Sequence, residues 1–434
     1  MRIPGRCMHV LLILALAPPA SARSQVEQEP LTLARVLEWA QAGSPRLKAS
    51  TAASHAAAHR APAAGALPDP SVQVGFTNLA LPDLSSTMSM SMAPSIQVTQ
   101  GIPFPGKRAL REEMAELEAA TAIAMESETW WRVRAGAAEL FYDLWLTDRS
   151  LDVQHATLGL LSEVESVAKS LYASGAGRQS DVLSSSVEVA RMEVEIRRLE
   201  SHRTVAAARL NALLGRDPRS GLAAPVLPPL TLRMPSGDTL RAWAEATRPL
   251  MEQARARLSH AEAAVRLARR DAWPDLMVGL QYGQRDRGTG VERMGGAVVG
   301  FSLPVFPGRR QRPMENAAEA MSLMADAQLA EARADVGASI ARGKAELERA
   351  RDLIALYLGE ILPQARAAVV SAFSSYRVGE VDFPTLLDAE LNVNRFQLEL
   401  HTLVHDYGTA LADLEAQIGR ELSPSDPSDV LEVS

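Results

Sequence analysis

The sequence has few of the residues that would support disulfides, thiolate metal sites or a basic nucleic-acid-binding face. Its 434 residues include one cysteine, Cys7, and aromatic residues account for 5% of the chain. A single cysteine excludes an internal disulfide and any metal site built from paired thiolates. Acidic residues outnumber lysine and arginine by 52 to 45, so nucleic-acid binding through a basic face is not expected.

Long apolar runs are also missing beyond the N-terminus. No later segment has 18 uninterrupted apolar residues, so a membrane span is expected only as a β-barrel. Residues 1–22 combine Arg2 and Arg6, a short apolar run and the small residues Ala20-Ser21-Ala22, which is typical of a secretory signal peptide. We predict cleavage after Ala22 and export, which removes Cys7 and leaves a net charge of about −9.

The most informative feature is an internal repeat. The segment 376–420 matches the segment 172–216, and the two begin at Tyr376 and Tyr172. Both segments carry apolar residues in a heptad pattern, which predicts helices that pack along one seam. One supersecondary unit has therefore been used twice.

Strands are predicted in two pairs, one in each repeat, from the alternation of apolar and polar residues. Four strands are too few to close a barrel, so the missing strands would come from other copies of the chain. An apolar outer face and a small polar inner face are expected on each strand. The predicted strands are 71–77 and 88–99 in the first repeat, and 276–282 and 297–303 in the second, where a polar loop at 283–290 separates them.

Long helices follow each strand pair. Proline-glycine sequences at 103–108 and 304–310 end the strands, and helix is predicted from there to Tyr172 and Tyr376, with Pro363 as the one interruption. At 1.5 Å per residue, each helix would be roughly 100 Å long. Helices of this length cannot fold back into a globular core and must form a bundle.

Shorter helices are expected to break at Gly43-Ser44-Pro45 and at Thr247-Arg248-Pro249, because proline suits the start of a new helix. The expected organisation is a signal peptide at 1–22, a first repeat of two strands and a helical hairpin at 23–216, an inter-repeat linker at 217–239, a second repeat at 240–420 and a flexible C-terminal tail at 421–434.

This order of features resembles the TolC family of outer-membrane efflux channels. The resemblance rests on the signal peptide, the duplicated unit, the Leu67-Pro68-Asp69-Pro70 and Phe104-Pro105-Gly106-Lys107-Arg108 junctions and the Tyr-x-x-Gly turns, and it covers residues 31–420. It implies a mainly α fold with a transmembrane β-barrel, in which a homotrimer forms a twelve-strand barrel on an α-helical periplasmic tunnel. The tunnel would lie in the outer membrane and periplasm of a Gram-negative bacterium.

The resemblance also implies passive conduction. An inner-membrane pump of the RND type and a periplasmic adaptor would deliver the substrate, and the channel would contact outer-membrane lipid and no nucleic acid. The residues contain no nucleophile–base set and no phosphate loop, so neither enzymatic activity nor a cofactor is expected. Heavy-metal cations are the favoured substrate; multidrug efflux, type I secretion and a non-channel periplasmic coiled-coil scaffold are the alternatives.

The two Tyr-x-x-Gly turns acquire roles from the same resemblance. Asp388 matches an aspartate that narrows the tunnel entrance, and Asp181 matches an aspartate that links neighbouring hairpins in the closed state. Tyr376 and Thr385 belong to the same periplasmic gate, although the family pattern can have an aspartate at Thr385 and an arginine at Val381. Helix capping by both aspartates is the alternative.

Adaptor docking is expected at the tips of these turns. The resemblance places Gly175, Gly379 and Arg377 there.

Other clusters allow weaker hypotheses. His55 and His59, like His401 and His405, have the i,i+4 spacing that suits a metal, but a third ligand is not placed by the sequence, so no metal site is predicted. The alternating methionines of the 88–99 strand suit either Cu(I) or a lipid- or loop-facing strand. These methionines are Met88, Met90 and Met92. The aromatic pairs Trp130-Trp131 and Phe141-Tyr142 are expected to be helix-packing residues or a collar in the tunnel.

Overall fold

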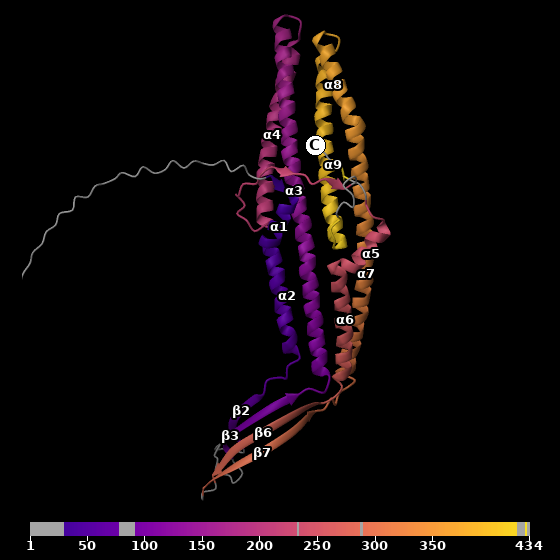
Figure 1. Cartoon of the computed structure of the whole chain (residues 1–434). Helices are drawn as coiled ribbons and strands as arrows, with labels where there is room; N and C mark the ends of the chain where they lie inside the picture. The colour runs from indigo at the N-terminus through magenta and orange to yellow at the C-terminus, as the bar shows by residue number, and fades with distance from the viewer. Residues whose placement is uncertain (1–29, 78–91, 232–233, 287–289, 423–429, 432–434) are drawn as a thin grey trace, which may run out of the picture.

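The protein forms a long helical bundle with a four-stranded sheet at one end (Figure 1). The structure is a computed structural model of the whole chain. It describes residues 30–77, 92–231, 234–286, 290–422 and 430–431.

The sheet is antiparallel and has the order β2-β3-β6-β7, so strands of the two repeats pair at its centre and β2 and β7 form its edges. Apolar residues align across one face, as in the row Val72, Val98 and Leu280, and these side chains are exposed. Glutamines align on the opposite face. The strands are β2 (Ser71–Thr77), β3 (Met92–Ile102), β6 (Asp275–Asp286) and β7 (Val291–Ser302).

The second strand pair is longer than predicted. Gly283 pairs with Met294 and Asp286 with Val291, so the first half of the expected 283–290 loop, residues 283–286, is strand. Backbone pairing continues there because it does not require the side-chain alternation on which the prediction depended. Met88 and Met90 lie outside the described residues, and Met92 begins β3.

The long helices confirm the predicted hairpins. The first hairpin's leading helix and the second hairpin's leading helix each run for 67 residues, or about 100 Å at 1.5 Å per residue. The second contains a π-helical turn just before Pro363, which lacks the backbone N–H that a regular α-helix would use. The elements are α3 (Lys107–Ala173) and α4 (Gln179–Leu213), then α7 (Gln311–Leu356), η1 (Tyr357–Ile361), α8 (Leu362–Arg377) and α9 (Phe383–Ile418).

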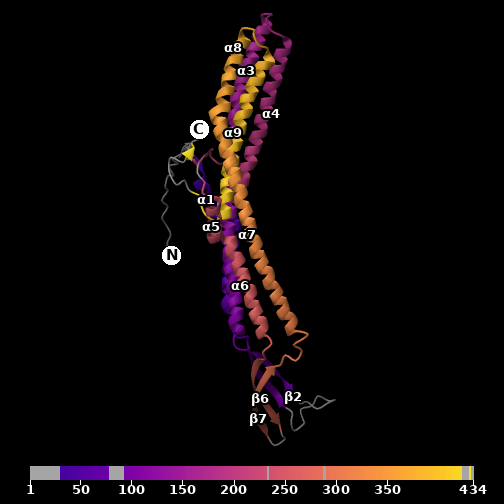
Figure 2. The ribbon, with the colours of Figure 1, turned by 90° about the vertical axis from the view of Figure 1, so that its right-hand side faces the viewer.

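The shorter helices are interrupted at the two prolines, as predicted. One break precedes Pro45 and the other precedes Pro249, and both prolines occupy the first turn of the next helix. The short helices that precede the breaks project from the middle of the bundle (Figure 2). The bounds are α1 (Leu33–Gly43), α2 (Pro45–Ala64), α5 (Gly237–Thr247) and α6 (Pro249–Arg270).

The predicted linker and tail contribute two small sheets. β1 (Leu31–Thr32) pairs with β4 (Pro225–Val226), and β5 (Leu230–Thr231) pairs with β8 (Val430–Leu431). Both pairs lie beside the short helices in the middle of the bundle (Figure 2).

The heptad seams form the core of the bundle. Leu210, Leu386 and Leu414 are completely buried, and none of the heptad positions of α4 and α9 is exposed. These positions are Val182, Ser185, Val189, Met192, Ile196, Leu199, Arg203, Ala206, Leu210 and Leu213 in α4, and Leu386, Ala389, Val393, Phe396, Leu400, Leu403, Tyr407, Ala410, Leu414 and Gln417 in α9. Phe141 and Tyr142 are also buried, which confirms them as helix-packing aromatics. The apolar heptads therefore bury the faces along which the hairpins meet.

In the part of the chain that the structure describes, one helix has the length and composition of a membrane span. The continuous helix from Gln311 to Arg377 contains an 18-residue window with a mean hydropathy of 1.4, of which 17% is buried in the chain. This helix runs beside α9 along the bundle and packs on it (Figures 1 and 2). Insertion would separate it from that partner, so the packing argues for a place in the bundle.

Two glycines test the packing of α9. A Cβ atom at Gly408 would overlap the buried ring of Tyr142, whereas one at Gly343 would meet Leu414 Cδ1 at 3.5 Å, an ordinary contact. Gly408→Ala is therefore expected to cost about 1–3 kcal/mol through overpacking. Gly343→Ala, the matched control, is expected to be neutral or to stabilise α7 by up to about 1 kcal/mol. Thermal unfolding followed by circular dichroism checks both; equal midpoints for the two variants would contradict the packing described.

Candidate functional site at the helical tips

The candidate site lies where the two helical hairpins turn, at the end of the bundle opposite the sheet (Figure 1). A cleft of about 690 Å³ separates the turns. The first hairpin lines it with residues from Leu171 to Ser184, and the second with residues from Tyr376 to Pro384. The site thus belongs to both repeats.

Both turns have the same backbone geometry. Gly175 and Gly379 have φ angles of +77° and +80°, which L-residues with side chains rarely adopt. The amides of Ala176 and Glu380 donate across each turn to carbonyls five residues earlier, at 2.9 Å. This is the Schellman arrangement that ends a helix, and it explains why each Tyr-x-x-Gly sequence stops its helix.

Asp382, which the sequence analysis did not identify, is the N-cap residue of α9. Asp382 accepts hydrogen bonds from the Thr385 backbone N–H at 3.2 Å and from the Thr385 hydroxyl at 2.5 Å. These bonds, the hydroxyl bond above all, lower the pKa of Asp382 below its ordinary value. Thr385, expected in the gate, is therefore engaged in the cap. An Asp-x-x-Thr sequence with a proline between was the available signal.

The Tyr376 ring anchors the second tip. It is 6% exposed and meets Phe383 edge to face, with the ring centroids 6.0 Å apart. Burial raises the pKa of Tyr376, and the nearby charge of Asp181 raises it further. The structure therefore brings together Asp181 of the first hairpin and Tyr376 of the second. Tyr172, the repeat equivalent of Tyr376, is 49% exposed instead.

The two predicted gate aspartates have different surroundings. Asp181 lies in the first turn of α4, where its negative charge suits the helix N-terminus, and the Ser180 hydroxyl donates to it at 3.2 Å. Asp388 is exposed beyond the first turn of α9 and does not cap that helix, since Asp382 does. Capping therefore does not explain Asp388. Arg377, Gly175 and Gly379 are all exposed at the tips.

Buried polar contacts fix the two hairpins against each other below the cleft. The Asn394 amide on α9 donates to Thr157 Oγ1 at 2.8 Å and to Gln154 Oε1 at 3.2 Å, both on α3. Glu390, one turn closer to the tip, is buried, and burial raises its pKa. These groups interrupt the apolar seam and fix which residues face each other, as polar groups do in coiled-coil cores.

The histidine pairs are not equivalent. His55 and His59 are exposed on α2, whereas the His401 ring packs edge to face on Trp145 with centroids 5.6 Å apart. Burial lowers the pKa of His401 to about 4, so it is neutral near pH 7. Within the described part of the chain, no three His, Cys, Asp or Glu side chains are grouped to hold a metal ion.

Comparison with known proteins identifies the fold. Residues 240–420 match the family described as outer membrane efflux protein, and no curated protein sequence matches the chain. The outer membrane protein VceC from Vibrio cholerae is similar over 90% of this chain and 96% of its own, with 20% identity and a TM-score of 0.76.

Two further solved channels have the same fold. CusC matches with a TM-score of 0.78 at 14% identity, covering 89% of this chain and 92% of its own. The open state of the MtrE outer membrane channel from Neisseria gonorrhoeae matches with a TM-score of 0.70 at 16% identity, covering 89% of each chain.

The cap of α9 gives a pH-dependent prediction. Because the folded state lowers the pKa of Asp382, the cap stabilises α9 above the ordinary value of 3.8 and is lost as the pH falls through the lowered value. Asp382→Ala is expected to speed amide exchange at Thr385 and Leu386 at neutral pH, and Asp388→Ala, the matched control, to leave it unchanged. Hydrogen exchange with mass spectrometry checks this; equal protection in both variants would exclude the cap.

Proposed function

We propose that the protein is the outer-membrane channel of a tripartite efflux system and conducts substrate passively. One observation carries this: an open four-stranded sheet with an exposed apolar face continues into helices about 100 Å long. The match of residues 240–420 to the outer membrane efflux protein family and the fold shared with solved outer-membrane channels support it. The protein is a channel and not an enzyme.

A homotrimer is the smallest assembly that leaves a passage. The two edges of the sheet, β2 and β7, must be paired in hydrocarbon, since an open edge leaves backbone groups without partners. Two copies would supply eight strands, and side chains fill the interior of an eight-stranded barrel. Three copies supply twelve and leave a lumen.

The two faces of the sheet suit such a barrel. The exposed apolar face includes Val74, Leu280 and Val299, of which 71%, 65% and 61% is accessible. Gln73 and Gln97 pair on the opposite face, which would line the lumen with polar groups. Alternation of apolar outward and polar inward residues is the pattern of outer-membrane barrels.

The opposite end of the bundle would then lie in the periplasm. Its exposed tips, with Arg377, Val378 and Gly379 on one turn and Gly175 on the other, offer a surface for a periplasmic adaptor. The adaptor would connect the channel to an inner-membrane pump of the RND type, which supplies the energy.

Heavy-metal cations are the substrate class that we favour, and the exposed His55 and His59 pair on α2 supports it. Multidrug efflux and type I secretion use the same passive route and differ in the pump. A strain that lacks the gene decides between them: metal sensitivity alone supports the first, and drug sensitivity alone the second. Unchanged tolerance of both would exclude either efflux role.

The gate proposal rests on the carboxylates at the tips. Exposed Asp388 would narrow the entrance and bind cations, and Asp181 beside Tyr376 would hold the two hairpins together when the tunnel is closed. Asp388→Ala is expected to reduce block by divalent cations in planar-bilayer recordings, because a negative charge at the entrance is lost.

The control for this recording is Asp238→Ala. Asp238 is 91% exposed at its side chain and lies at the start of α5, in the middle of the bundle and far from the tips (Figure 1). Asp238→Ala therefore removes one negative charge, as Asp388→Ala does, but away from the tips. Equal currents and equal cation block in wild type and Asp388→Ala would remove the gate proposal.

A further inference from the structure

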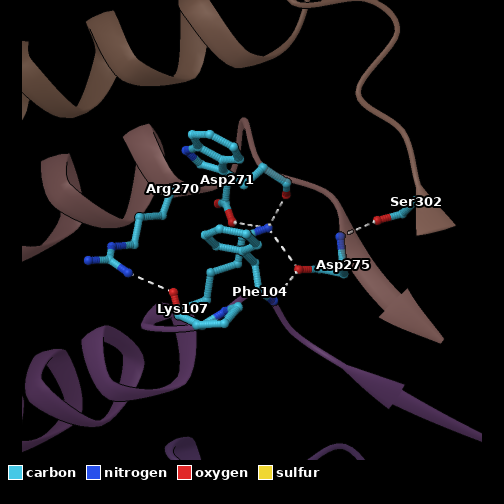
Figure 3. Close-up of polar contacts among 8 residues, drawn as sticks. Phe104, Lys107, Arg270, Asp271, Asp275 and Ser302 are labelled. Carbon is cyan, nitrogen blue, oxygen red and sulfur yellow. Dashed lines mark hydrogen bonds and ion pairs between the residues drawn. The ribbon is translucent and has the colours of Figure 1, made fainter. Parts of the chain in front are cut away.

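A buried lysine joins the two repeats where the sheet meets the helices (Figure 3). The side chain of Lys107, at the start of α3, is 4% exposed. Its Nζ atom lies 2.9 Å from Asp275 Oδ1 and 3.5 Å from Asp271 Oδ1, and it donates to the Trp273 carbonyl at 2.9 Å. A buried ammonium with three oxygen partners is well compensated, which a buried charge requires.

Neighbouring contacts complete this junction. The rings of Phe104 and Trp273 stack with centroids 5.2 Å apart, and the Phe104 backbone N–H donates to Asp275 Oδ1 at 2.8 Å. Arg270 donates to the Pro105 carbonyl at 2.6 Å. The link between β3 and α3 of the first repeat is thus fixed to the link between α6 and β6 of the second repeat.

The junction has two halves, a strand-to-helix link and a helix-to-strand link, and each repeat contains one of each. Within the residues that the structure describes, only the strand-to-helix link of the first repeat and the helix-to-strand link of the second repeat contact each other. The first repeat also has a helix-to-strand link, Leu67-Pro68-Asp69-Pro70, which matches Trp273-Pro274-Asp275 in the second. The second repeat also has a strand-to-helix link, Phe306-Pro307-Gly308-Arg309-Arg310, which matches Phe104-Pro105-Gly106-Lys107-Arg108 in the first. In this match Asp69 takes the place of Asp275, and Arg309 that of Lys107.

These two remaining half-junctions lie at opposite edges of the sheet. The first adjoins β2 and the second adjoins β7 (Figure 1). Phe306 is 68% exposed, whereas its counterpart Phe104 is partly buried, and Asp69 and Arg309 are both exposed. Among the described residues, neither the Asp69 carboxylate nor the Arg309 guanidinium has an ion-pair partner.

We propose that Arg309 of one copy and Asp69 of the next form an ion pair that repeats the Lys107–Asp275 contact between chains. Phe306 would pack on Leu67 as Phe104 packs on Trp273. The partner is a second copy of this chain, because each edge carries the half that the other lacks, with the opposite charge. The inference rests on the proposed trimer and defines how its seams close where barrel and tunnel meet.

The strand order supports this pairing. Neighbours alternate in direction across β2-β3-β6-β7, so β7 of one copy and β2 of the next would also be antiparallel, like β3 and β6. Within the chain, Val98 faces Leu280. Val305 is an extra residue in the second copy, so the strands match one residue out of step with the links, with Leu303-Pro304 in the place of Ile102-Pro103. This strand match sets Val299 against Val74, an apolar pair on the face that is already apolar.

Arg309 stands where the first repeat has Lys107, and an arginine suits an exposed contact between chains. A guanidinium presents a planar fork that binds a carboxylate through two hydrogen bonds, and it stays charged at any relevant pH. Lys107 has three partners within its own chain, whereas Arg309 would depend on one carboxylate of a neighbour. The bidentate geometry supplies directionality at that single contact.

Cross-linking tests the seam directly. In a chain with Cys7→Ser, the pair Leu67→Cys and Phe306→Cys is treated with a short bifunctional maleimide in the outer-membrane fraction. We expect covalent dimers and trimers on a denaturing gel. The control pair Phe104→Cys and Trp273→Cys joins positions within one chain and is expected to give an internally linked monomer. Each single-cysteine variant should give only monomer.

Two failures are distinguishable. If light scattering of the detergent-extracted protein shows a trimer and the control pair reacts while Leu67→Cys with Phe306→Cys does not, the seam is wrong and the proposed function stands. A monomer by light scattering would overturn both the seam and the proposed trimer.

Charge reversal gives an independent test. Arg309→Asp and Asp69→Arg are each expected to lower the temperature at which the trimer dissociates on a mildly denaturing gel, and the double variant is expected to recover most of that loss. Arg309→Lys, which restores the residue of the first repeat, should lie close to wild type. A double variant no better than the sum of the two single changes would refute the pairing.

Discussion

The requirement that backbone hydrogen-bonding groups be paired governs this molecule. A sheet with two open edges cannot lie in hydrocarbon, where unpaired N–H and C=O groups find no water. Within the described residues this sheet consists of β2, β3, β6 and β7 and has two open edges, so in hydrocarbon it would be complete only in an assembly. The proposed trimer, the lumen and the seam between Asp69 and Arg309 all follow from closing those edges.

The helical part meets a second constraint, which is that helices of 67 residues need packing partners along their whole length. Their heptad seams give each hairpin an internal core, while Asn394 and its partners on α3 fix one hairpin against the other. At the far end, Tyr376 and Phe383 close the packing beneath the turns. Because both hairpins line the tip cleft, a small relative movement of the hairpins would change the width of the proposed tunnel entrance.

The sequence was sufficient for the architecture because the architecture is periodic. Heptads, strand alternation, the prolines at 45 and 249 and the repeated Tyr-x-x-Gly turns predicted the elements and their order. It was insufficient where a side chain's role depends on tertiary neighbours. Asp382, not Asp388, caps α9, and Lys107 is buried because two aspartates of the other repeat meet it. The different exposures of Tyr172 and Tyr376 could not be predicted either, because the repeat pattern treats the two positions as equivalent.

The mass of the detergent-extracted protein, taken from the outer-membrane fraction and determined by light scattering after size exclusion, tests the central claim most directly. The account predicts a protein mass of three chains, each of 46.7 kDa less the signal peptide. A protein that remains monomeric and soluble without detergent would contradict it. The exposed apolar face of the sheet would then need another explanation, and the periplasmic coiled-coil scaffold would become the leading alternative.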